Sequence, residues 1–345
     1  MKIKPEELKK VAIEILKGFQ ATEEEAAVVA ECLIHADRRG IDTHGVYFLT
    51  LLAKRVKEGM IQIPTHIEIV RDDSATGLID GGNGLGQVAA HRAMEMSIEK
   101  ARRFGMGSIA VRNTNHIGIL AFYTLRIAEQ GMVGIVMCNG AASMPPWGGA
   151  EPFFGTNPIS FSLPGSGEPV VLDMSSSLVA RGKIRRAERM KESIPLGWAL
   201  DQNGEPTTDP SAAMKGTLVP IGGPKGYGLA LMVDVLAGLL SGSQFGPQVK
   251  TFHQPLGPTG VGVLIMAIDV NRFMPIQQFK RLMESYGDSI KKSRKAKGVS
   301  RIYLPGEIES EKDKKSLAEG IELSDSTTDS LNQLLEEVRS PLKLQ

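Results

Sequence analysis

Hydrophobic positions follow a helical period at the start of the chain and a strand period further on. Residues 5–58 carry apolar side chains at three- and four-residue spacing, which predicts two amphipathic helices followed by a third at about 47–57. From residue 67 onward, short apolar runs alternate with helical segments, the longest of which is 87–104. This change of period predicts an α/β protein. The expected strands are residues 67–70, 76–80, 109–111, 133–137 and 261–269.

The second half of the chain is less regular. Residues 139–225 are rich in Gly, Pro and Ser, and only 179–191 has a helical pattern. We therefore expect most of this stretch to form binding loops. Residues 227–240 are apolar nearly all round, which predicts a buried helix. A further helix at 276–296 and a charged C-terminal helix are expected to close the chain.

Composition and charge disfavour several classes of partner. The 345 residues are enough for a large core, and 40 basic against 39 acidic side chains leave a net charge of +1. This balance gives no support for a nucleic acid or an anionic membrane as partner. The N-terminus lacks the apolar segment of a signal peptide, and two isolated cysteines make no disulfide framework. We therefore expect a cytoplasmic protein in a reducing compartment.

One histidine stands between a predicted strand and a predicted helix. His116 lies in the run RNTNHIGIL (residues 112–120), after a buried strand and before a helix at 120–129. A helix N-terminus disfavours the imidazolium ion, so we expect His116 to be neutral and able to accept a proton. It is our candidate general base. Taken alone, the segment favours a histidine that only caps its own helix.

A second histidine has a similar setting. His44 lies in GIDTHGV (residues 40–46), beside the hydroxyl of Thr43 and where a helix at about 23–39 ends. Two histidines in Gly-flanked polar breaks predict one site assembled from distant segments. No His or Cys spacing typical of a metal site occurs, so no metal is expected. The other histidines fit ordinary helix or loop surface, and these are His35, His66, His91 and His253.

A glycine-rich segment before the helix at 227–240 is a candidate phosphate site. The run GGPKGYG (residues 222–228) lets the backbone approach an anion, points free N–H groups at it and adds the charge of Lys225. An ordinary helix start with a surface lysine fits this run equally well. The run GLGQVA (residues 84–89) matches the Rossmann fingerprint, but no acid follows about twenty positions later. We interpret it as a tight strand-to-helix turn.

These segments also occur, in this order, in a known enzyme family. With GIDTHGV, NTNHIG, the run WGGAE through GTNP (residues 147–158) and PKGYG, the chain resembles the malate/L-lactate dehydrogenase family of the second type. That family includes ureidoglycolate, sulfolactate and malate dehydrogenases as well as cyclic imine reductases. The resemblance extends from the first helix to about Glu322. In motif spacing, the chain is most similar to ureidoglycolate dehydrogenase.

The resemblance implies a fold, a cofactor and an assembly. It implies a three-layer α/β core with a largely antiparallel or mixed sheet and a non-Rossmann dinucleotide site, residues 76–307. It further implies an N-terminal helical dimerisation part, residues 1–75, packed with the C-terminal helix 308–345, and a homodimer. NAD is the implied cofactor, and NADP is an alternative. Matching positions assign cofactor binding to Asp173, Met174, Ser175, Ser176, Ser177, Pro224, Lys225, Pro305, Gly306 and Glu307.

The resemblance also implies a reaction. A hydride passes between the nicotinamide cofactor and C2 of a small 2-hydroxy or 2-oxo acid of malate, lactate, ureidoglycolate or sulfolactate type. His116 is the expected proton carrier, His44 is expected to share that role, and Thr43, at a position usually occupied by serine, donates a hydrogen bond to the substrate oxygen. Two alternatives stay open: an NAD(P)H-dependent cyclic imine reductase, and a dinucleotide-binding protein without turnover.

One part of the site departs from the family pattern. Relatives commonly have an arginine and a tyrosine where this chain has Phe48 and Leu52. An aromatic ring rewards apolar contact and does not neutralise an anion. The sequence therefore predicts a monocarboxylic or partly apolar substrate, unless Arg55, Arg181 or Lys183 supplies the missing cation.

Overall fold

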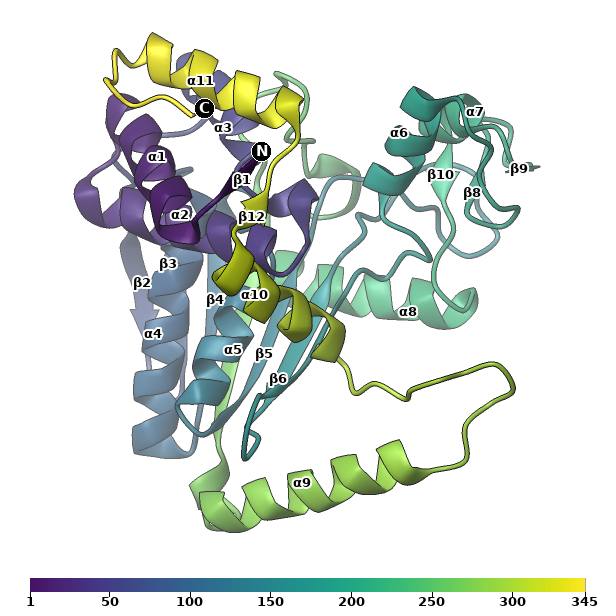
Figure 1. The fold of residues 1–345 in the computed structure, drawn as a ribbon. Helices are drawn as coiled ribbons and strands as arrows, with labels where there is room; N and C mark the ends of the chain where they lie inside the picture. Colours follow the sequence, from purple (N-terminus) through teal and green to yellow (C-terminus); the bar gives the residue numbers. More distant parts are fainter. Residues whose placement is uncertain (345) are drawn as a thin grey trace.

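A single mixed β-sheet organises the protein, whose residues 1–344 are described by a computed structural model (Figure 1). Its seven strands lie in the order β2–β3–β4–β11–β5–β6–β7. Strands β3 and β4 are parallel, and all other neighbours are antiparallel. The predicted α/β fold with a mixed, largely antiparallel sheet is confirmed. The strands are β2 (Glu68–Asp72), β3 (Thr76–Asp80), β4 (Met106–Thr114), β5 (Met132–Cys138), β6 (Ile159–Leu163), β7 (Val170–Met174) and β11 (Val261–Asp269).

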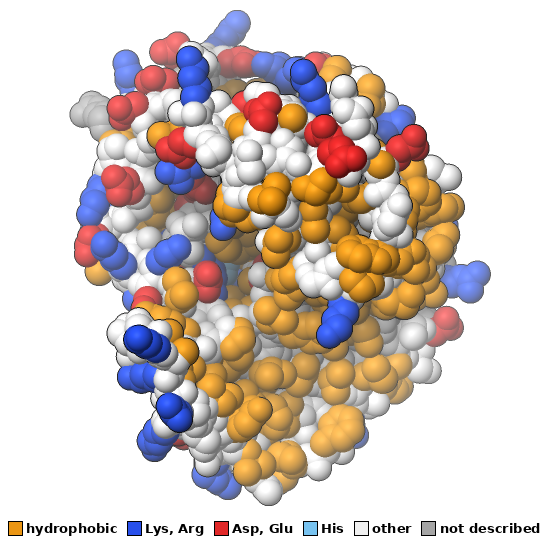
Figure 2. Space-filling view, turned by 90° about the vertical axis from the view of Figure 1, so that its right-hand side faces the viewer, with side chains coloured by type: hydrophobic (Ala, Val, Ile, Leu, Met, Phe, Trp, Pro, Cys, Tyr) orange, Lys and Arg blue, Asp and Glu red, His pale blue; other side chains and the backbone are white. Residues whose placement is uncertain are grey.

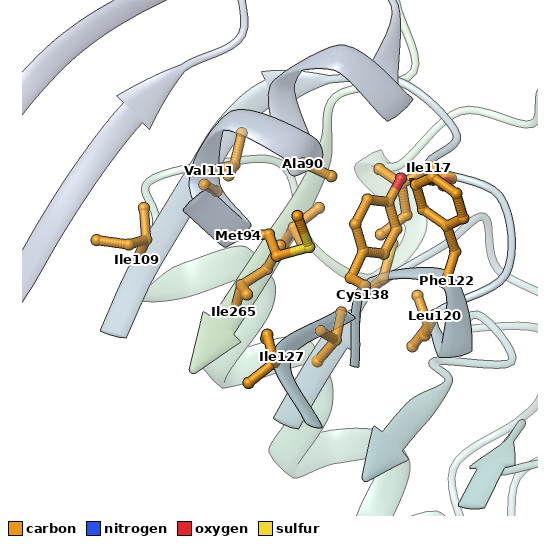
Figure 3. Close-up of a cluster of buried hydrophobic side chains, with 14 of the residues drawn as sticks. Ala90, Met94, Ile109, Val111, Ile117, Leu120, Phe122, Ile127, Cys138 and Ile265 are labelled. Atoms are coloured by element: carbon orange, nitrogen blue, oxygen red, sulfur yellow. Dashed lines mark hydrogen bonds between the residues drawn. The ribbon is translucent and has the colours of Figure 1, made fainter. Parts of the chain in front are cut away.

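Two helices cover one face of this sheet. Helix α4 (Gly86–Phe104) packs on β4 and β11, and α5 (Ala121–Glu129) packs on β5 and β6. The central strands turn fully buried side chains such as Ile109, Val136 and Ile265 toward these helices. Ile117 and Leu120 belong to the same core (Figure 3). Because they flank the loop that carries His116, the core fixes the position of that loop.

The opposite face of the sheet is covered only in part. Helix α8 (Pro224–Val233) continues into a π-helix, η2 (Asp234–Leu239), which lies across β4, β5 and β11. Within residues 1–344, the expected three-layer arrangement is therefore complete on one face only. The prediction that the helix at 227–240 is buried is wrong, since Met232 is 51% exposed and Leu240 63% exposed. Apolar residues all round a helix indicate partners on every side, and this chain provides them on one side only.

The N-terminal helices form a second core with the C-terminal end of the chain. Helix α2 starts with a capping box in which Thr22 and Glu25 satisfy each other's backbone N–H groups. The predicted single C-terminal helix is two helices with a short strand between them, and Gln345 lies outside the described residues. The elements of this part are β1 (Lys2–Ile3), α1 (Pro5–Gly18), α2 (Glu23–Arg38), the 3₁₀ turn η1 (Asp42–His44), α3 (Phe48–Lys57), α10 (Glu307–Glu319), β12 (Ile321–Glu322) and α11 (Asp325–Glu337).

The stretch expected to be mostly loops contains more structure than its composition indicates. It supplies β6 and β7 to the central sheet and then forms a small lobe beside α8 (Figure 1). Short strands between Gly- and Pro-rich turns give little periodicity, which is why the pattern missed them. The lobe contains α6 (Arg181–Met190), β8 (Ala199–Leu200), β9 (Pro206–Thr207), α7 (Pro210–Lys215) and β10 (Thr217–Leu218).

The remaining elements follow the lobe. Helix α9 (Ile276–Lys292) runs apart from the sheet at the lower edge of the molecule in Figure 1. Two 3₁₀ turns, η3 (Gly246–Gln248) and η4 (Val270–Arg272), flank β11. Among residues 1–344, no helix combines the length and the hydrophobicity that crossing a membrane requires.

Candidate active site

The loop that carries His116 is fixed by hydrogen bonds between the neighbouring Asn115 side chain and two distant segments of the chain. It connects β4 to α5, and the Asn115 side chain fixes it by donating to the Gly84 carbonyl at 2.9 Å and accepting from the Thr259 hydroxyl at 2.9 Å. Gly86 at the start of α4 lies so close that a Cβ there would be 2.4 Å from the Asn115 carbonyl oxygen. Gly86 of the Rossmann-like run thus allows close packing under the His116 loop, while Gly84 lies against Thr65, as expected of a tight turn.

The turn that carries His44 is built on a buried carboxylate. Asp37 of α2 accepts a hydrogen bond from the Val46 N–H at 2.8 Å. A Cβ on Gly45 would lie 1.8 Å from the same carboxylate, so only glycine fits after His44. Burial raises the pKa of Asp37 to about 7. The turn therefore depends on this one acceptor and on the absence of a side chain at residue 45.

The two histidines lie side by side. Their ring centres are 5.2 Å apart, and the Thr43 hydroxyl is 2.9 Å from His44 Nδ1. Phe48 stacks 4.5 Å from His116 and 4.7 Å from Phe252. We call His44, His116, Phe48 and Phe252 the histidine cluster. Two segments that are more than seventy residues apart in sequence thus meet in one apolar, aromatic surrounding.

His116 is neutral for a reason other than the one its sequence position indicates. Burial, together with smaller contributions from the neighbouring His44 and His253, lowers the pKa of His116 to about 3. The N-terminus of α5 is already capped, because the Asp173 carboxylate accepts the Ala121 N–H at 2.7 Å. His116 Nδ1 accepts the Gly118 N–H at 3.1 Å. In this ring orientation, the proton of neutral His116 is on Nε2.

The carboxylate and hydroxyls after β7 are largely engaged within the protein. Asp173 caps α5, and burial raises its pKa to about 6. The Ser176 hydroxyl donates to the Thr156 carbonyl at 2.7 Å, and Ser177 donates to the Val179 carbonyl at 2.8 Å. Met174 and Ser175 are half-buried. Of the assigned serines, Ser175 has the hydroxyl best able to meet a ligand.

The serine segment and the lysine segment form one wall. The Ile221 N–H donates to the Ser176 carbonyl at 2.9 Å, which places the start of α8 beside the serines. Pro224 and Lys225 begin that helix and are exposed. Trp147 lies against Gly223, where a Cβ would be 3.0 Å from the indole ring. We call residues 175–177 together with 224–225 the serine–lysine wall.

The third segment assigned to the cofactor, Pro305 to Glu307, lies beside the start of β7. The Val171 N–H donates to the Pro305 carbonyl at 3.2 Å, and Gly306 lies against the Val171 side chain. Glu307 forms an ion pair with Lys291 on α9 and accepts the Leu304 N–H at 2.9 Å. These residues line a cavity of about 310 Å³. Since Val171 precedes the serines by four strand residues, roughly 13 Å separates the segments.

The structure decides the role of Arg55, one of the cations that the sequence offered in place of the missing arginine, and it brings in Phe252, which the sequence gave no reason to select. Arg55 is buried, and its guanidinium donates to the Gly257 carbonyl at 2.7 Å and lies over the Phe252 ring at 4.7 Å. It therefore holds the loop of Phe252. His253 follows in that loop and is exposed, as the sequence predicts for a surface histidine, and it contributes to the lowered pKa of His116. No periodicity marks this loop in the sequence.

Two more residues lie in surroundings that the sequence pattern does not show, namely His35 and Leu52. His35 packs edge-on against Phe122 at 5.8 Å with its Nε2 buried, so it is not a surface histidine. Burial lowers its pKa to about 3. Leu52, at the position where relatives have tyrosine, is buried in the N-terminal core. Leu52 therefore stabilises α3 and does not line the histidine cluster.

Comparison with known proteins places this geometry in a family. The family model described as malate/L-lactate dehydrogenase matches residues 3–332. The chain belongs to the malate/L-lactate dehydrogenase family. The L-sulfolactate dehydrogenase of Methanocaldococcus jannaschii is 40% identical over 338 residues, which are 98% of this chain and 97% of that protein. The solved structure of the sulfolactate dehydrogenase from that organism matches with a TM-score of 0.93 over 99% of this chain and 98% of that chain.

Two further relatives name a cofactor. Ureidoglycolate dehydrogenase (NAD(+)) of Escherichia coli strain K12 is 35% identical over 327 residues, covering 94% of this chain and 93% of that protein. The (2R)-3-sulfolactate dehydrogenase (NADP(+)) of Chromohalobacter salexigens is 38% identical over 269 residues, 77% of this chain and 80% of that protein. Identity over the whole chain thus ranks a sulfolactate enzyme above the ureidoglycolate enzyme that the motif spacing indicated. The predicted NAD(P)-dependent oxidoreductase of 2-hydroxy acids is confirmed by these relatives.

Proposed function

We propose that the histidine cluster and the serine–lysine wall form one active site, in which a 2-hydroxy acid is oxidised and a 2-oxo acid is reduced. The observation that carries this proposal is the link through Asp173. Its carboxylate caps the helix after the His116 loop, and its backbone leads directly into Ser175. A dinucleotide on the wall would therefore have its reactive end beside the buried histidines.

The residues present fit a nicotinamide dinucleotide. The start of α8 offers free backbone N–H groups, and Lys225 adds a positive charge that no acidic side chain pairs within residues 1–344. Ser175 offers a hydroxyl, and Pro305, Gly306 and the cavity beside them fit the far end of the cofactor. When bound, the cofactor supplies or accepts the hydride at C2. Asp173 contributes by positioning α5, since its carboxylate is already occupied.

We infer that His116 and His44 share the proton transfer. His116 Nε2 is the nitrogen free to face the substrate oxygen, and in the orientation seen it donates a hydrogen bond to the oxygen of a 2-oxo acid. When hydride adds to C2, the Nε2 proton moves to the forming alkoxide oxygen, and His116 Nδ1 takes up a proton in its place, so the ring stays a neutral imidazole. His44, whose ring centre is 5.2 Å away, is on the path by which that proton arrives, and the Thr43 hydroxyl at its Nδ1 fixes its ring. Both rings are half-buried, and Phe48 packed on His116 limits the access of water to these protons.

Turnover with a panel of acids tests the function. We expect NADH or NADPH absorbance to fall when the protein is mixed with oxaloacetate, pyruvate or sulfopyruvate. Cofactor binding seen by nicotinamide fluorescence without loss of absorbance would indicate a binding protein. Faster turnover of a cyclic imine acid than of every 2-oxo acid would favour the reductase alternative, which the named relatives do not support.

We also propose a homodimer, formed through the uncovered face of the sheet. On that face, Phe161, Ile135 and Met266 lie in one row across three strands and are only half-buried. The neighbouring helices add exposed apolar side chains, with Tyr286 of α9 65% exposed and Phe273 78% exposed. Figure 2 shows hydrophobic side chains gathered with few charges over the side of the molecule where α8 lies. Monomers rarely expose a continuous apolar surface of this kind.

A second copy of the chain is the occupant that this face fits best. Helix α9 stands apart from its own sheet and presents apolar residues at helical spacing, so the α9 helices of two copies related by a twofold axis can each pack on the other's uncovered sheet face. The N-terminal helices, by contrast, bury their apolar side chains, such as Leu8 and Leu33, in their own core. For that reason we place dimer contacts on the sheet face and not on the helical part.

Light scattering tests the assembly. The unmodified protein should have the mass of a dimer, and Tyr286→Glu combined with Leu240→Glu should give a monomer. Leu342→Glu, which changes an exposed leucine beside the N-terminal helices, is the matched control and should leave the dimer intact. If only Leu342→Glu gives a monomer, the dimer contact lies on the N-terminal helical part and the proposal is wrong.

The cysteines fit the expected reducing compartment. Cys32 and Cys138 are both buried and free, and burial raises each thiol pKa to about 12. Neither thiol is therefore set up to form a disulfide or to react. We propose a cytoplasmic location on this basis.

A further inference from the structure

Replacing arginine by Phe48 leaves the histidine cluster without a cation of its own. Phe48 is only 5% exposed and stacks on His116, so this side of the site is apolar. Of the cations that the sequence offers in its place, Arg55 is committed to the carbonyls of the Phe252 loop. A substrate with two acidic groups therefore needs positive charge from another element.

Helix α6 of the lobe reaches the site. Its second residue, Gly182, lies directly against Thr43, since a Cβ there would be 3.2 Å from Thr43 Cγ2. Arg181 precedes Gly182 and is half-buried, with one guanidinium nitrogen donating to the Met214 carbonyl at 2.7 Å. Arg185 is one helical turn further on and shares its face of the helix.

The electrostatics of the exposed His253 link α6 to the histidine cluster. The pKa of His253 is lowered by burial and then by Arg185 and Arg181, and His253 is the last of the three causes that lower the pKa of His116. The guanidinium of Arg181 has donors left after its single bond to Met214. A half-buried guanidinium beside an apolar surface binds a carboxylate or sulfonate more strongly than an exposed one does.

We propose that Arg181 and Arg185 bind the second anionic group of the substrate, a carboxylate or sulfonate on C3, and so make this protein selective for dianionic 2-oxo and 2-hydroxy acids. The proposal rests on the proposed function and assigns a specificity role to α6. Thr43 and the histidines meet the C2 oxygen, while α6 closes the site from the lobe side. The apolar character of Phe48 then shapes the site but does not decide the charge of the substrate.

The test compares a dianion with a monoanion in matched variants. Arg181→Gln and Arg185→Gln each remove one charge. Arg185 and Arg186 are both exposed, but Arg186 does not lie on the helix face that Arg181 and Arg185 share, so Arg186→Gln is the control. Two quantities are measured for oxaloacetate, sulfopyruvate and pyruvate. One is kcat/KM for reduction, and the other is the dissociation constant with oxidised cofactor present, a combination in which no turnover occurs.

The unmodified protein should bind oxaloacetate or sulfopyruvate more tightly than pyruvate, and the two acids show whether carboxylate or sulfonate fits better. Either test variant should weaken binding and kcat/KM for the dianions by about 10- to 100-fold, the range of one charge-assisted hydrogen bond. Pyruvate should change by less than about 3-fold, and Arg186→Gln should change neither. Melting temperatures report whether the loss of the Met214 bond has unfolded Arg181→Gln, and Arg185→Gln then carries the test.

Three results would overturn the proposal: equal losses for dianions and pyruvate, no loss in either variant, or an unmodified protein that binds pyruvate best. The last of these would support the monocarboxylic preference that Phe48 predicts. If no 2-oxo acid is reduced at all, the proposed function fails, while the dissociation constants still decide the role of α6.

Discussion

The two ends of the proposed active site are built in opposite ways. At the histidine cluster, the ionisable rings are buried among aromatic side chains, and burial holds His116 neutral. At the serine–lysine wall, Lys225 is exposed at the start of a helix. One end partly shields from water the groups that are proposed to exchange protons, and the other leaves a full charge in water.

This difference follows from what each end must do. A proton carrier works when its two protonation states are close in free energy at the moment of reaction, and a dry surrounding lets the substrate charge adjust that balance. A phosphate clamp needs only attraction that is equal before and during the reaction. We therefore expect changes at the histidine cluster to affect turnover and changes at the wall to affect binding.

The largest effect is expected at His116. His116→Ala should lower kcat by roughly two to four orders of magnitude, because it removes the group that we propose to face the reacting oxygen. Cofactor affinity, measured by nicotinamide fluorescence, should stay within about 2-fold of the unmodified protein. His66→Ala, at an exposed histidine, is the control. Near-normal turnover in His116→Ala would make His116 a structural residue.

His44 should have a smaller and mixed effect. His44→Ala removes both the second proton carrier and the ring packed beside His116, so kcat should fall by about 10- to 100-fold and KM for the 2-oxo acid should rise. Steady-state kinetics over a range of substrate concentrations separate the two terms. A change in KM alone would leave proton transfer to His116.

Lys225 should affect binding without affecting chemistry. Lys225→Ala should weaken NADH or NADPH binding by roughly 10-fold, less than a buried charge would, with kcat at saturating cofactor unchanged. The affinity of the unmodified protein should also fall as salt is added, because the charge is exposed. Lys215→Ala on α7 is the matched control. If Lys225→Ala and Lys215→Ala bind the cofactor equally well, Lys225 does not contact the phosphates and the phosphate site lies elsewhere.

The smallest effect concerns stability and pH. The pKa of His116 in the folded protein, about 3, is below its value in the unfolded chain, so below about pH 6.5 the unfolded chain holds a proton that the folded protein lacks. Stability from this group is therefore lost as the pH falls from about 6.5 toward 3. Denaturant titrations at pH 6 and pH 5 should show His116→Ala gaining about 1 kcal/mol relative to the unmodified protein. If the free energy of unfolding changes equally with pH in His116→Ala and in the unmodified protein, the His116 ring is solvated and its pKa is not lowered.

Local patterns predicted those parts of the fold in which short-range and long-range preferences agree. Helix α2 starts at its capping box and α4 and α5 lie where the apolar period places them, because each is amphipathic and packs one face on a core that the same chain provides. The helix at 227–240 was misjudged because its outer side faces no other part of this chain. Periodicity reports that a side chain is apolar, and it does not report which chain covers it.

The sequence by itself determined which residue types the site contains, since both histidines, Thr43 and Lys225 stand in motifs whose Gly neighbours mark unusual backbone. Only the tertiary structure decided their environment. The neutral state of His116 comes from burial against Phe48 and not from the dipole of α5, which Asp173 caps. Desolvation and contacts between distant segments depend on how the whole chain packs, so no local pattern of residues encodes them.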